Sequence, residues 1–222
     1  MAGTLYVVAT PIGNLGDVTA RAVDVLRAVD LIAAEDTRHT RLLLQRHGID
    51  TPMTSCYDAV ERTKGAELVQ RLVAGAQIAL VSDAGTPGIA DPGGSLIPQA
   101  ITAGVPVVAI PGPCAAIAAL VVSGLPMDRF VFEGYLPVKP GPRRRRLEAL
   151  RGEPRTIVCY ETPHRLVKSL AAIEETLGDV PMSVARELTK LFEEVRRGTV
   201  AEHRRHFEQY APRGEFVLVF HS

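Results

Sequence analysis

The sequence predicts an α/β fold of two α/β domains, with a parallel-rich sheet in the first domain and a mixed sheet in the second. Short apolar runs without polar alternation recur along the chain, and most are followed by stretches whose apolar residues recur at helical spacing. Such runs are typical of strands that helices cover on both faces, and the order strand, helix, strand favours a parallel sheet with right-handed crossovers. Glycine- and proline-rich loops follow several of these runs, and in open α/β sheets ligands bind at the carboxyl ends of strands.

The first domain is expected to cover residues 1–125. After its first apolar run, Val18, Ala22 and Leu26 lie on one helical stripe, and Asp17 is a suitable N-cap for that helix. The expected strands are residues 5–9, 31–34, 51–56, 78–81 and 105–110. Helical patterns cover residues 18–29 and 58–74, one ends at residue 48, and two begin near residues 95 and 115.

The second domain is expected to cover residues 126–222, because the character of the sequence changes near residue 125. Strands expected at residues 183–187 and 193–199 are close enough in sequence to form a hairpin, which favours a mixed sheet. Further strands are expected at residues 130–135, 156–160 and 215–220. A turn is expected at residues 137–142, followed by a short helix with four arginines, and longer helices at residues 165–177 and 200–210.

The composition is that of an ordinary globular protein, since 46% of the 222 residues are hydrophobic and 23% are charged. The formal net charge is zero, so a nucleic-acid partner has to be argued from a local basic patch. Cys56, Cys114 and Cys159 have no paired spacing, which favours a reducing compartment over a disulfide framework or a zinc ribbon. Neither a signal peptide nor a membrane-spanning stretch is recognisable, so we expect a cytoplasmic protein without a membrane partner.

The loop at residues 82–94 is the stretch around which we expect the first domain to be organised. It combines aspartates, glycines and prolines, among them Asp83, Asp91, Gly85, Gly88, Pro87 and Pro92. Glycines let backbone approach a ligand closely, and prolines stiffen a loop that would otherwise be floppy. The alternative is a long ordered turn without a ligand, but a loop of this kind is more often functional.

Three such loops, residues 10–17, 82–94 and 111–115, are expected at strand ends of the first domain. None fits a dinucleotide or P-loop template, because the segment GNLG at residues 13–16 lacks the required glycine triplet. An anionic phosphate usually calls for a lysine or a free helix N-terminus, whereas these loops offer aspartates and hydroxyls. They therefore favour a ligand with ribose hydroxyls and positive charge over NAD or ATP.

Seven segments in chain order point to one family: ATPIGNLGDVT, AEDTR, SDAGTPGIADPG, IPGPCA, YETPHR, ARELTKLFEE and GEFVLV. Together they resemble the ribosomal RNA small-subunit methyltransferase I family within the tetrapyrrole-methylase superfamily. The resemblance implies a homodimer and S-adenosylmethionine as methyl donor, bound in a cleft between two α/β domains. It implies methylation of a cytidine ribose 2′-hydroxyl in the decoding region of small-subunit (16S) ribosomal RNA, either free or in the assembled 30S subunit. Relatives often carry a further C-terminal extension beyond the position of Ser222.

The cofactor residues are expected in the loops of the first domain, with further contacts from the second. Asp83 is suited to bond a ribose hydroxyl or an amine, while apolar side chains and loop backbone are suited to surround the adenine. The first set is Pro11, Asp83, Ala84, Gly85, Ile89, Cys114 and Ala115, and the resemblance adds Tyr160, Arg186 and Glu187. As alternatives, Asp83 caps a turn, Tyr160 belongs to the core, and Cys114 is a packing residue rather than a nucleophile.

The catalytic candidates are charged residues near strand ends. Asp36 follows the second expected strand and is a candidate for the general base that a weakly acidic ribose hydroxyl needs. Arg38 is suited to hold a phosphate, and Lys190 is suited to stabilise developing oxyanion charge. Glu193 or Glu194 would orient Lys190, and for each of these residues a solvated or ion-paired charge is the alternative.

No metal site is expected from the sequence. His203 and His206 lie three residues apart on an expected helix, but no third ligand is apparent. We interpret the pair as part of a solvated helix face.

A basic segment at residues 138–155 carries seven basic and two acidic residues, a local net charge of +5. Its four consecutive arginines are expected in the first turn of a helix, where they oppose the macrodipole unless phosphates bind them. We therefore expect RNA contact from Arg143, Arg144, Arg145 and Arg146, with a solvated helix end as the alternative. The patch argues against a methyltransferase of a tetrapyrrole or another small molecule, and a non-catalytic module that binds S-adenosylmethionine is the third alternative.

Overall fold

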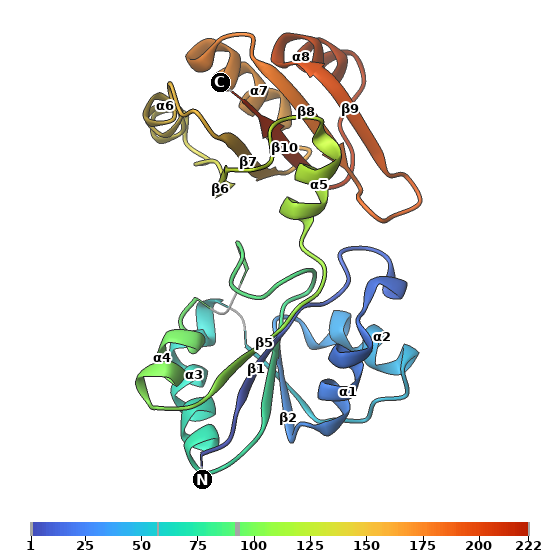
Figure 1. Ribbon diagram of the computed structural model, residues 1–222, viewed down its shortest axis with the longest axis vertical. Helices are drawn as coiled ribbons and strands as arrows, with labels where there is room; N and C mark the ends of the chain where they lie inside the picture. Colours follow the sequence, from blue (N-terminus) through green and yellow to red (C-terminus); the bar gives the residue numbers. More distant parts are fainter. Residues whose placement is uncertain (1, 57, 92–93, 222) are drawn as a thin grey trace. The chain divides into compact units, whose positions relative to one another are not determined.

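The computed structural model describes residues 2–56, 58–91 and 94–221. The chain forms two compact units, Met1–Cys114 and Ala115–Ser222, and each consists of a five-stranded sheet with helices packed against it (Figure 1). The expected α/β class is therefore confirmed in both units. None of the helices in this described part of the chain has the length and apolar character needed to cross a membrane.

The first unit has a parallel sheet with strand order β3-β2-β4-β1-β5. Its strands are β1 Leu5–Val8, β2 Leu31–Ala34, β3 Met53–Ser55, β4 Ile78–Val81 and β5 Val107–Ile110. Its helices are η1 Leu15–Asp17 (a short 3₁₀ helix), α1 Ala20–Ala28, α2 Thr37–Arg46, α3 Asp58–Val73 and α4 Leu96–Thr102. Because the strands are parallel, their carboxyl ends lie along one edge of the sheet, and the expected ligand loops follow β1, β4 and β5 at that edge.

Helices cover both faces of this sheet, which explains why its strands lack polar alternation. Ala79 and Val81 of β4 belong to one core cluster with the buried residues of α1 and α2. Ile78 and Leu80 belong to another cluster, with α3 and α4. All four residues of β4 are consequently buried, as expected for a central strand of a parallel sheet that is covered on both sides.

Helix α1 begins later than the sequence suggested. Thr19 is its N-cap, and the Thr19 hydroxyl oxygen accepts a hydrogen bond from the backbone N–H of Ala22 at 3.1 Å. Asp17 instead ends the helix η1, whose own cap is Asn14. The prediction that Asp17 caps α1 is therefore wrong, because a separate 3₁₀ turn precedes the α-helix.

The second unit has a mixed sheet with strand order β6-β7-β10-β8-β9 (Figure 1). Its strands are β6 Phe130–Tyr135, β7 Thr156–Glu161, β8 Pro181–Arg186, β9 Glu194–Thr199 and β10 Phe216–Phe220. Its helices are α5 Ala115–Ser123, α6 Pro140–Ala149, α7 Leu166–Leu177 and α8 Val200–Gln209. Strand β6 runs parallel to β7 and the other neighbouring pairs are antiparallel, so the expected mixed sheet and the β8–β9 hairpin are confirmed.

The main core of the second unit joins one face of the sheet to α6, α7 and α8, where Leu147 and Phe207 are buried with Leu218. Helix α5 packs against β7, β8 and β10. Val217 and Val219, which alternate with Leu218 along β10, are also buried. Because successive side chains of a strand point to opposite faces, α5 covers the second face of this sheet.

Helix α5 groups with the second unit, so the chain divides after Cys114. The sequence pattern placed the boundary near residue 125, one helix later. The sequence of α5, AAIAALVVS, is apolar on every side, and such a helix does not indicate which sheet will bury it. The contacts of α5 with β7, β8 and β10 decide its place.

Helix α6 starts at Pro140, inside the segment that was expected to be a turn. Proline is favoured at the start of a helix because the N–H that it lacks would have no partner there. The arginines Arg143 to Arg146 therefore follow the first three helical residues instead of opening the helix. The unfavourable macrodipole interaction expected for them is correspondingly smaller, since it is confined to the first turn.

Candidate active site

The three expected ligand loops of the first unit are bonded to one another. Thr10 and Gly85 form an antiparallel bridge, with N–H···O distances of 2.8 and 3.1 Å. The Thr10 hydroxyl donates to the carbonyl oxygen of Ser82 at 3.1 Å, and the Thr86 hydroxyl donates to the carbonyl oxygen of Pro113 at 3.1 Å. Segments that follow β1, β4 and β5 thus form a single structure at the carboxyl edge of the sheet.

Two glycines make this close approach of the loops possible. Gly85 has a φ of +85°, and a Cβ added there would lie 3.4 Å from Ile12 Cγ2. A Cβ added to Gly112 would lie 2.9 Å from the Cβ of Ala9, closer than two such atoms normally approach. Gly85 is favoured for its positive φ, since a Cβ there would only contact Ile12, whereas a Cβ at Gly112 would push against Ala9.

The loop after β4 continues through two further residues with positive φ. Gly88 has a φ of +83° and Ala90 a φ of +62°. The left-handed region costs a residue with a Cβ about 1–2 kcal/mol, and such strain occurs preferentially at binding and catalytic sites. Pro92, which was expected to stiffen the loop, lies outside the described residues.

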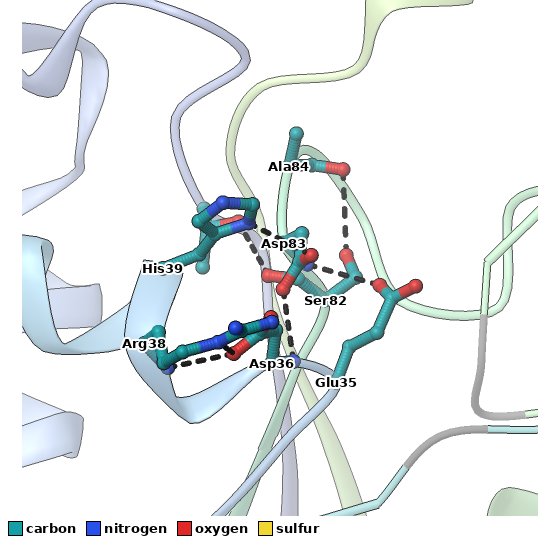
Figure 2. Close-up of polar contacts among 8 residues, drawn as sticks. Glu35, Asp36, Arg38, His39, Ser82, Asp83 and Ala84 are labelled. Carbon is teal, nitrogen blue, oxygen red and sulfur yellow. Dashed lines mark hydrogen bonds and ion pairs between the residues drawn. The ribbon is translucent and has the colours of Figure 1, made fainter.

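Asp83 connects the end of β4 to the end of β2 (Figure 2). Its Oδ1 accepts a hydrogen bond from the backbone N–H of Asp36 at 2.9 Å, and its own N–H donates to Glu35 Oε2 at 3.1 Å. Its Oδ2 lies 3.0 Å from Nδ1 of His39. The carboxylate of Asp83 is therefore held from both sides by residues at the start of α2.

His39 was not among the residues that the sequence suggested. It lies in the first turn of α2, and its partner Asp83 follows a strand much later in the chain. The two meet because β2 and β4 are neighbours in the sheet, an order that the sequence pattern does not reveal. A histidine just after the carboxyl end of a parallel strand was the signal that could have raised it as a candidate.

Asp36 is the N-cap of α2 and forms a two-pronged ion pair with Arg38. Its carboxylate accepts hydrogen bonds from the Arg38 backbone N–H at 2.8 Å, from Nε at 3.1 Å and from Nη2 at 2.6 Å. The side-chain bonds from Arg38, followed by the backbone bond, lower the pKa of Asp36 to about 2. A carboxylate with so low a pKa is a weak proton acceptor, so the geometry argues against Asp36 as the general base.

The remaining cofactor candidates of this edge differ in exposure. Ile89 is 39% exposed, which leaves an apolar side chain available at the loop surface. Ala84 is also exposed, and its carbonyl oxygen accepts a bond from the Ser82 hydroxyl at 3.4 Å (Figure 2). Pro11 and Gly85 are buried, and Cys114 and Ala115 are half-buried.

Tyr160, near the end of β7 in the second unit, is hydrogen-bonded to the start of α5. Its hydroxyl oxygen accepts a hydrogen bond from the backbone N–H of Ala116 at 3.2 Å. Its ring makes edge-to-face contacts with Phe132 and Tyr135, at centroid distances of 5.0 and 5.7 Å. Tyr160 is half-buried, so it combines an aromatic packing role with a fixed position beside the N-terminus of α5.

Lys190 forms salt bridges with Glu187 Oε1 at 2.9 Å and with Glu215 Oε2 at 2.8 Å. Burial alone would lower the pKa of Lys190, but the hydrogen bonds to Glu215 and Glu187 outweigh that effect, and the pKa is raised. Lys190 is therefore a protonated ammonium group between two carboxylates. Glu187 and Glu215 orient it, which corrects the expectation that Glu193 or Glu194 does so.

Glu193 and Glu194 have other partners in the β8–β9 hairpin. Glu193 Oε2 accepts a bond from the backbone N–H of Thr189, a residue with a φ of +67°. Glu194 pairs with Arg186 at 3.6 Å and with Arg196 at 3.3 Å. Both carboxylates therefore stabilise the shape and charge balance of the hairpin, which contains the predicted cofactor residue Arg186.

Known proteins with similar sequences identify the family. Residues 4–203 match the family model described as Tetrapyrrole (Corrin/Porphyrin) Methylases. A ribosomal RNA small subunit methyltransferase I from Pseudomonas aeruginosa is 54% identical over 202 residues, covering 90% of this chain and 72% of the relative. A protein of the same name from Synechocystis is 53% identical over 218 residues, covering 98% and 78%. The chain belongs to the ribosomal RNA small subunit methyltransferase I family.

Solved structures of other tetrapyrrole-methylase-like proteins have the same fold as this family member. Diphthine synthase matches with a TM-score of 0.77 and 16% identity, over 99% of this chain and 90% of that protein. Uroporphyrin-III-C-methyltransferase from Thermus thermophilus matches with a TM-score of 0.68 and 21% identity, over 98% and 94%. The expected tetrapyrrole-methylase-like architecture is thus confirmed for this methyltransferase.

The four consecutive arginines that were expected to bind RNA have different surroundings in this member of the family. Arg143 is only 5% exposed, and its Nη1 donates a hydrogen bond to the Ser169 hydroxyl at 3.2 Å. A guanidinium buried in this way does not reach a phosphate on the surface. The prediction of RNA contact by Arg143 is therefore contradicted by its burial.

The other three arginines are more accessible. Arg144 pairs with Glu148 at 2.9 Å, one helical turn later. Arg146 forms two hydrogen bonds to the carboxylate of Glu133, at 2.5 and 2.6 Å. Arg145 is exposed. Of the expected RNA contacts, Arg144 and Arg145 are thus the better placed.

A second basic feature of the second unit is a cavity of about 500 Å³ between the edge strand β9 and α8. Five of its lining residues lie on α8, and two arginines come from β9. The lining residues are Arg196, Arg197, Glu202, His203, Arg205, His206 and Gln209.

His203 does not lie on a solvated face, which corrects the interpretation of the His203 and His206 pair. The His203 side chain is buried, with Nε2 3.1 Å from the carbonyl oxygen of Met182. Burial lowers the pKa of His203. Burial and the nearby charge of Arg196 lower the pKa of His206, so both imidazoles are disfavoured as cations beside these arginines.

Proposed function

We propose that this methyltransferase transfers the methyl group of S-adenosylmethionine to the 2′-hydroxyl of a cytidine ribose in small-subunit ribosomal RNA. The names of its relatives from Pseudomonas aeruginosa and Synechocystis support a small-subunit ribosomal RNA substrate. The cytidine, the 2′-hydroxyl, the decoding region and a homodimer are proposed from the resemblance of the seven sequence segments. The observation that carries the proposal is the bonded group of loops at the ends of β1, β4 and β5, joined to α2 through Asp83.

The residues at these loops fit S-adenosylmethionine. Gly85 adopts a positive φ that gives the loop its close turn, and Ile89 offers an exposed apolar side chain. Asp83 supplies a partly exposed carboxylate, and each of its oxygens has a second lone pair for a ribose hydroxyl or an ammonium group. When bound, S-adenosylmethionine supplies an electrophilic methyl group. The loops would hold the adenosine, and the charged groups at the ends of β2 and β4 would face the acceptor.

We propose Arg144 and Arg145 of α6 as contacts to RNA phosphates, together with Arg196 and Arg205 of the β9–α8 cavity. Exposed ion pairs such as Arg144 with Glu148 contribute little to stability, so a phosphate can replace the carboxylate. Phosphate contacts position RNA without reading its sequence. The choice of nucleotide must therefore come from the site that holds the acceptor ribose, and the proposed substrate would place the protein in the cytoplasm.

The experiment that tests this function uses labelled S-adenosylmethionine and small subunits from a strain that lacks the methylation. Large subunits and deproteinised small-subunit RNA serve as controls. We expect label in the small-subunit RNA, at a single cytidine whose 3′ phosphodiester resists alkaline cleavage because its 2′-hydroxyl is blocked. Label on a base, or on a different nucleotide, would refute the finer assignment.

The same experiment separates the alternatives. A small-molecule methyltransferase would leave both ribosomal subunits unlabelled and would label a tetrapyrrole offered in their place. A non-catalytic module would bind S-adenosylmethionine in a calorimetric titration without consuming it in either reaction. Either result would overturn the proposed function.

A further inference from the structure

We propose that His39 is the general base that accepts the proton of the substrate hydroxyl, and that Asp83 is the residue that positions it. This inference rests on the proposed function, because it assumes a hydroxyl acceptor. It assigns a role to a residue that the sequence did not suggest, and the side chains that carry it come from two neighbouring strand ends (Figure 2).

The tautomer of His39 follows from its partner. Nδ1 of His39 lies 3.0 Å from Oδ2 of Asp83, and an ionised carboxylate only accepts hydrogen bonds. Nδ1 therefore carries the proton of the neutral imidazole, and Nε2 keeps its lone pair. In hydrolytic triads a carboxylate orients the histidine in the same way, because its hydrogen bond to one ring nitrogen leaves the other nitrogen available as a base.

The carboxylate that orients His39 is itself fixed. Oδ1 of Asp83 accepts the N–H of Asp36 at 2.9 Å, and the N–H of Asp83 donates to Glu35 at 3.1 Å. These two bonds join the end of β2 to the end of β4 next to the contact between Asp83 and His39. The backbone hydrogen bonds at Asp83 thus hold the carboxylate in place, and a general base needs a partner that is fixed in this way.

His39 is also accessible. Its side chain is 65% exposed, and Figure 2 shows its second ring nitrogen directed away from Asp83. The imidazole lies beside the loop after β4, which carries the predicted cofactor residues Ala84 and Gly85. A hydroxyl placed at this edge would therefore meet a lone pair on Nε2.

The other candidates for the base are less suitable. Both oxygens of Asp36 accept hydrogen bonds from Arg38, and the pKa of Asp36 is lowered to about 2. Lys190 is a protonated ammonium group held by Glu187 and Glu215. An ammonium group stabilises negative charge but accepts no proton.

The proposed reaction transfers one methyl group to the ribose and one proton to His39. The ribose oxygen forms a bond to the methyl carbon while the carbon–sulfur bond breaks, and the bonding pair stays on the sulfur of the methylsulfonium donor. The proton of the hydroxyl moves to Nε2 of His39, giving an imidazolium beside the Asp83 carboxylate. Release of that proton to water restores the starting state.

A metal ion is the competing explanation for the same side chains. One ligand atom from each of Asp36, His39 and Asp83 lies within 4.8 Å of the others. A cation bound there would compete with Arg38 for the Asp36 carboxylate and with Asp83 for the His39 ring, because these groups already bond one another. The geometry therefore favours His39 as a base over a metal site.

The first test reads the tautomer without any reaction. In the full-length protein with ¹⁵N-labelled histidine rings, long-range ¹H–¹⁵N spectra at mildly alkaline pH should show His39 protonated at Nδ1 and bare at Nε2. The signal is assigned by its loss in His39→Gln. Asp83→Asn should shift His39 toward a tautomer mixture, and an unchanged spectrum in Asp83→Asn, or a proton on Nε2 of the wild type, would overturn the proposal.

The second test measures single-turnover methylation of undermethylated small subunits. His39→Gln should lower the rate by about a hundredfold or more, with unchanged affinity for S-adenosylmethionine and an unchanged melting temperature. His47→Gln, at the other end of α2, is the matched control and should react at the wild-type rate. A His39→Gln rate within threefold of wild type would overturn the base assignment.

The pH dependence separates a base from a structural histidine. Asp83, Asp36, Glu35 and Arg38 are the charged groups at this edge, and in His39→Gln all four remain. If His39 accepts the proton of the hydroxyl, the pH profile of the single-turnover rate should change in His39→Gln. A pH profile that is the same in His39→Gln and in the wild type would overturn the proposal.

Two further outcomes are distinguishable. Binding of Mg²⁺ to the wild-type protein in a calorimetric titration, lost in His39→Gln, would identify the cluster as a metal site and overturn the base. A wild-type protein that methylates neither the free RNA nor the subunit would overturn the proposed function and the base role together, while the tautomer spectrum would still decide whether Asp83 orients His39.

Discussion

Replacing Arg143 with alanine should destabilise the second unit instead of weakening RNA binding. The buried Arg143 donates to Ser169, and the Ser169 hydroxyl donates to Glu161 Oε2 at 2.5 Å. Glu161 is also buried and pairs with Arg165 at 3.2 Å. Removal of Arg143 takes one cation out of a buried network in which Ser169 links Arg143 to the Glu161 carboxylate and Arg165 pairs with that carboxylate directly.

The magnitude follows from the contacts that are lost. A hydrogen bond from a charged donor contributes about 1.5–3 kcal/mol, and the aliphatic stem of a buried arginine adds packing. We therefore expect a loss of about 2–4 kcal/mol in the free energy of unfolding. For a chain of about 200 residues, each kcal/mol shifts the melting temperature by roughly 2–4 °C, which gives a decrease of roughly 5–15 °C by calorimetry.

Arg145→Ala is the matched control on the same helix. Arg145 is exposed, so its replacement should change stability by no more than about 0.5 kcal/mol. If Arg145 contacts a phosphate, the log–log salt dependence of small-subunit binding should flatten by about one unit. The affinity for S-adenosylmethionine should be the same in both variants.

The opposite results in the two variants would contradict the buried position of Arg143. An Arg143→Ala protein with a wild-type melting temperature and a shallower salt slope would mean that Arg143 leaves its buried position to bind RNA. An unchanged slope in Arg145→Ala would remove Arg145 from the proposed surface. The RNA contacts would then have to be sought at Arg196 and Arg205 in the cavity between β9 and α8.

Three further predictions concern the charged groups of the candidate site. Asp36→Asn should lower the melting temperature at neutral pH, and the difference from wild type should disappear as pH falls from about 4 to about 2, because the folded-state pKa of Asp36 lies below its ordinary value. Lys190→Gln should also be destabilising at neutral pH, and here the difference should shrink as pH rises into the alkaline range, because the folded-state pKa of Lys190 is raised. An Asp36 or Lys190 effect that does not depend on pH would contradict the ion pairs. Asp83→Ala should weaken binding of S-adenosylmethionine in a calorimetric titration without unfolding the protein, and an unchanged affinity would remove Asp83 from the cofactor site.

The strands of the first unit could be predicted because burial on both faces leaves continuous apolar runs. Ile78, Ala79, Leu80 and Val81 are all buried, so no polar residue interrupts the pattern. The loops that follow such runs could also be predicted, since glycine and proline mark them. Their bonding to one another follows from the parallel sheet, in which strands far apart in sequence end at one edge.

The pairing of His39 with Asp83 could not be predicted in the same way. It depends on β2 lying next to β4, and hydrophobic patterns describe each strand without describing its neighbours. The ion pair of Asp36 could not be predicted for a related reason. A carboxylate at a strand end resembles a catalytic base in sequence, but Asp36 also begins a helix, and Arg38 lies close enough to neutralise it.

The arginines of α6 show that position on a helix decides what a charged residue does. Arg143 is in line with Leu147, four residues on, and both are buried against the core. Arg144 is in line with Glu148 and pairs with it at the surface. Arg145 lies on neither of these lines. A run of identical residues thus divides between the core and the solvent. The number of phosphate contacts that α6 can make is therefore smaller than the number of its arginines, which is why we propose the β9–α8 cavity as a second basic surface for RNA.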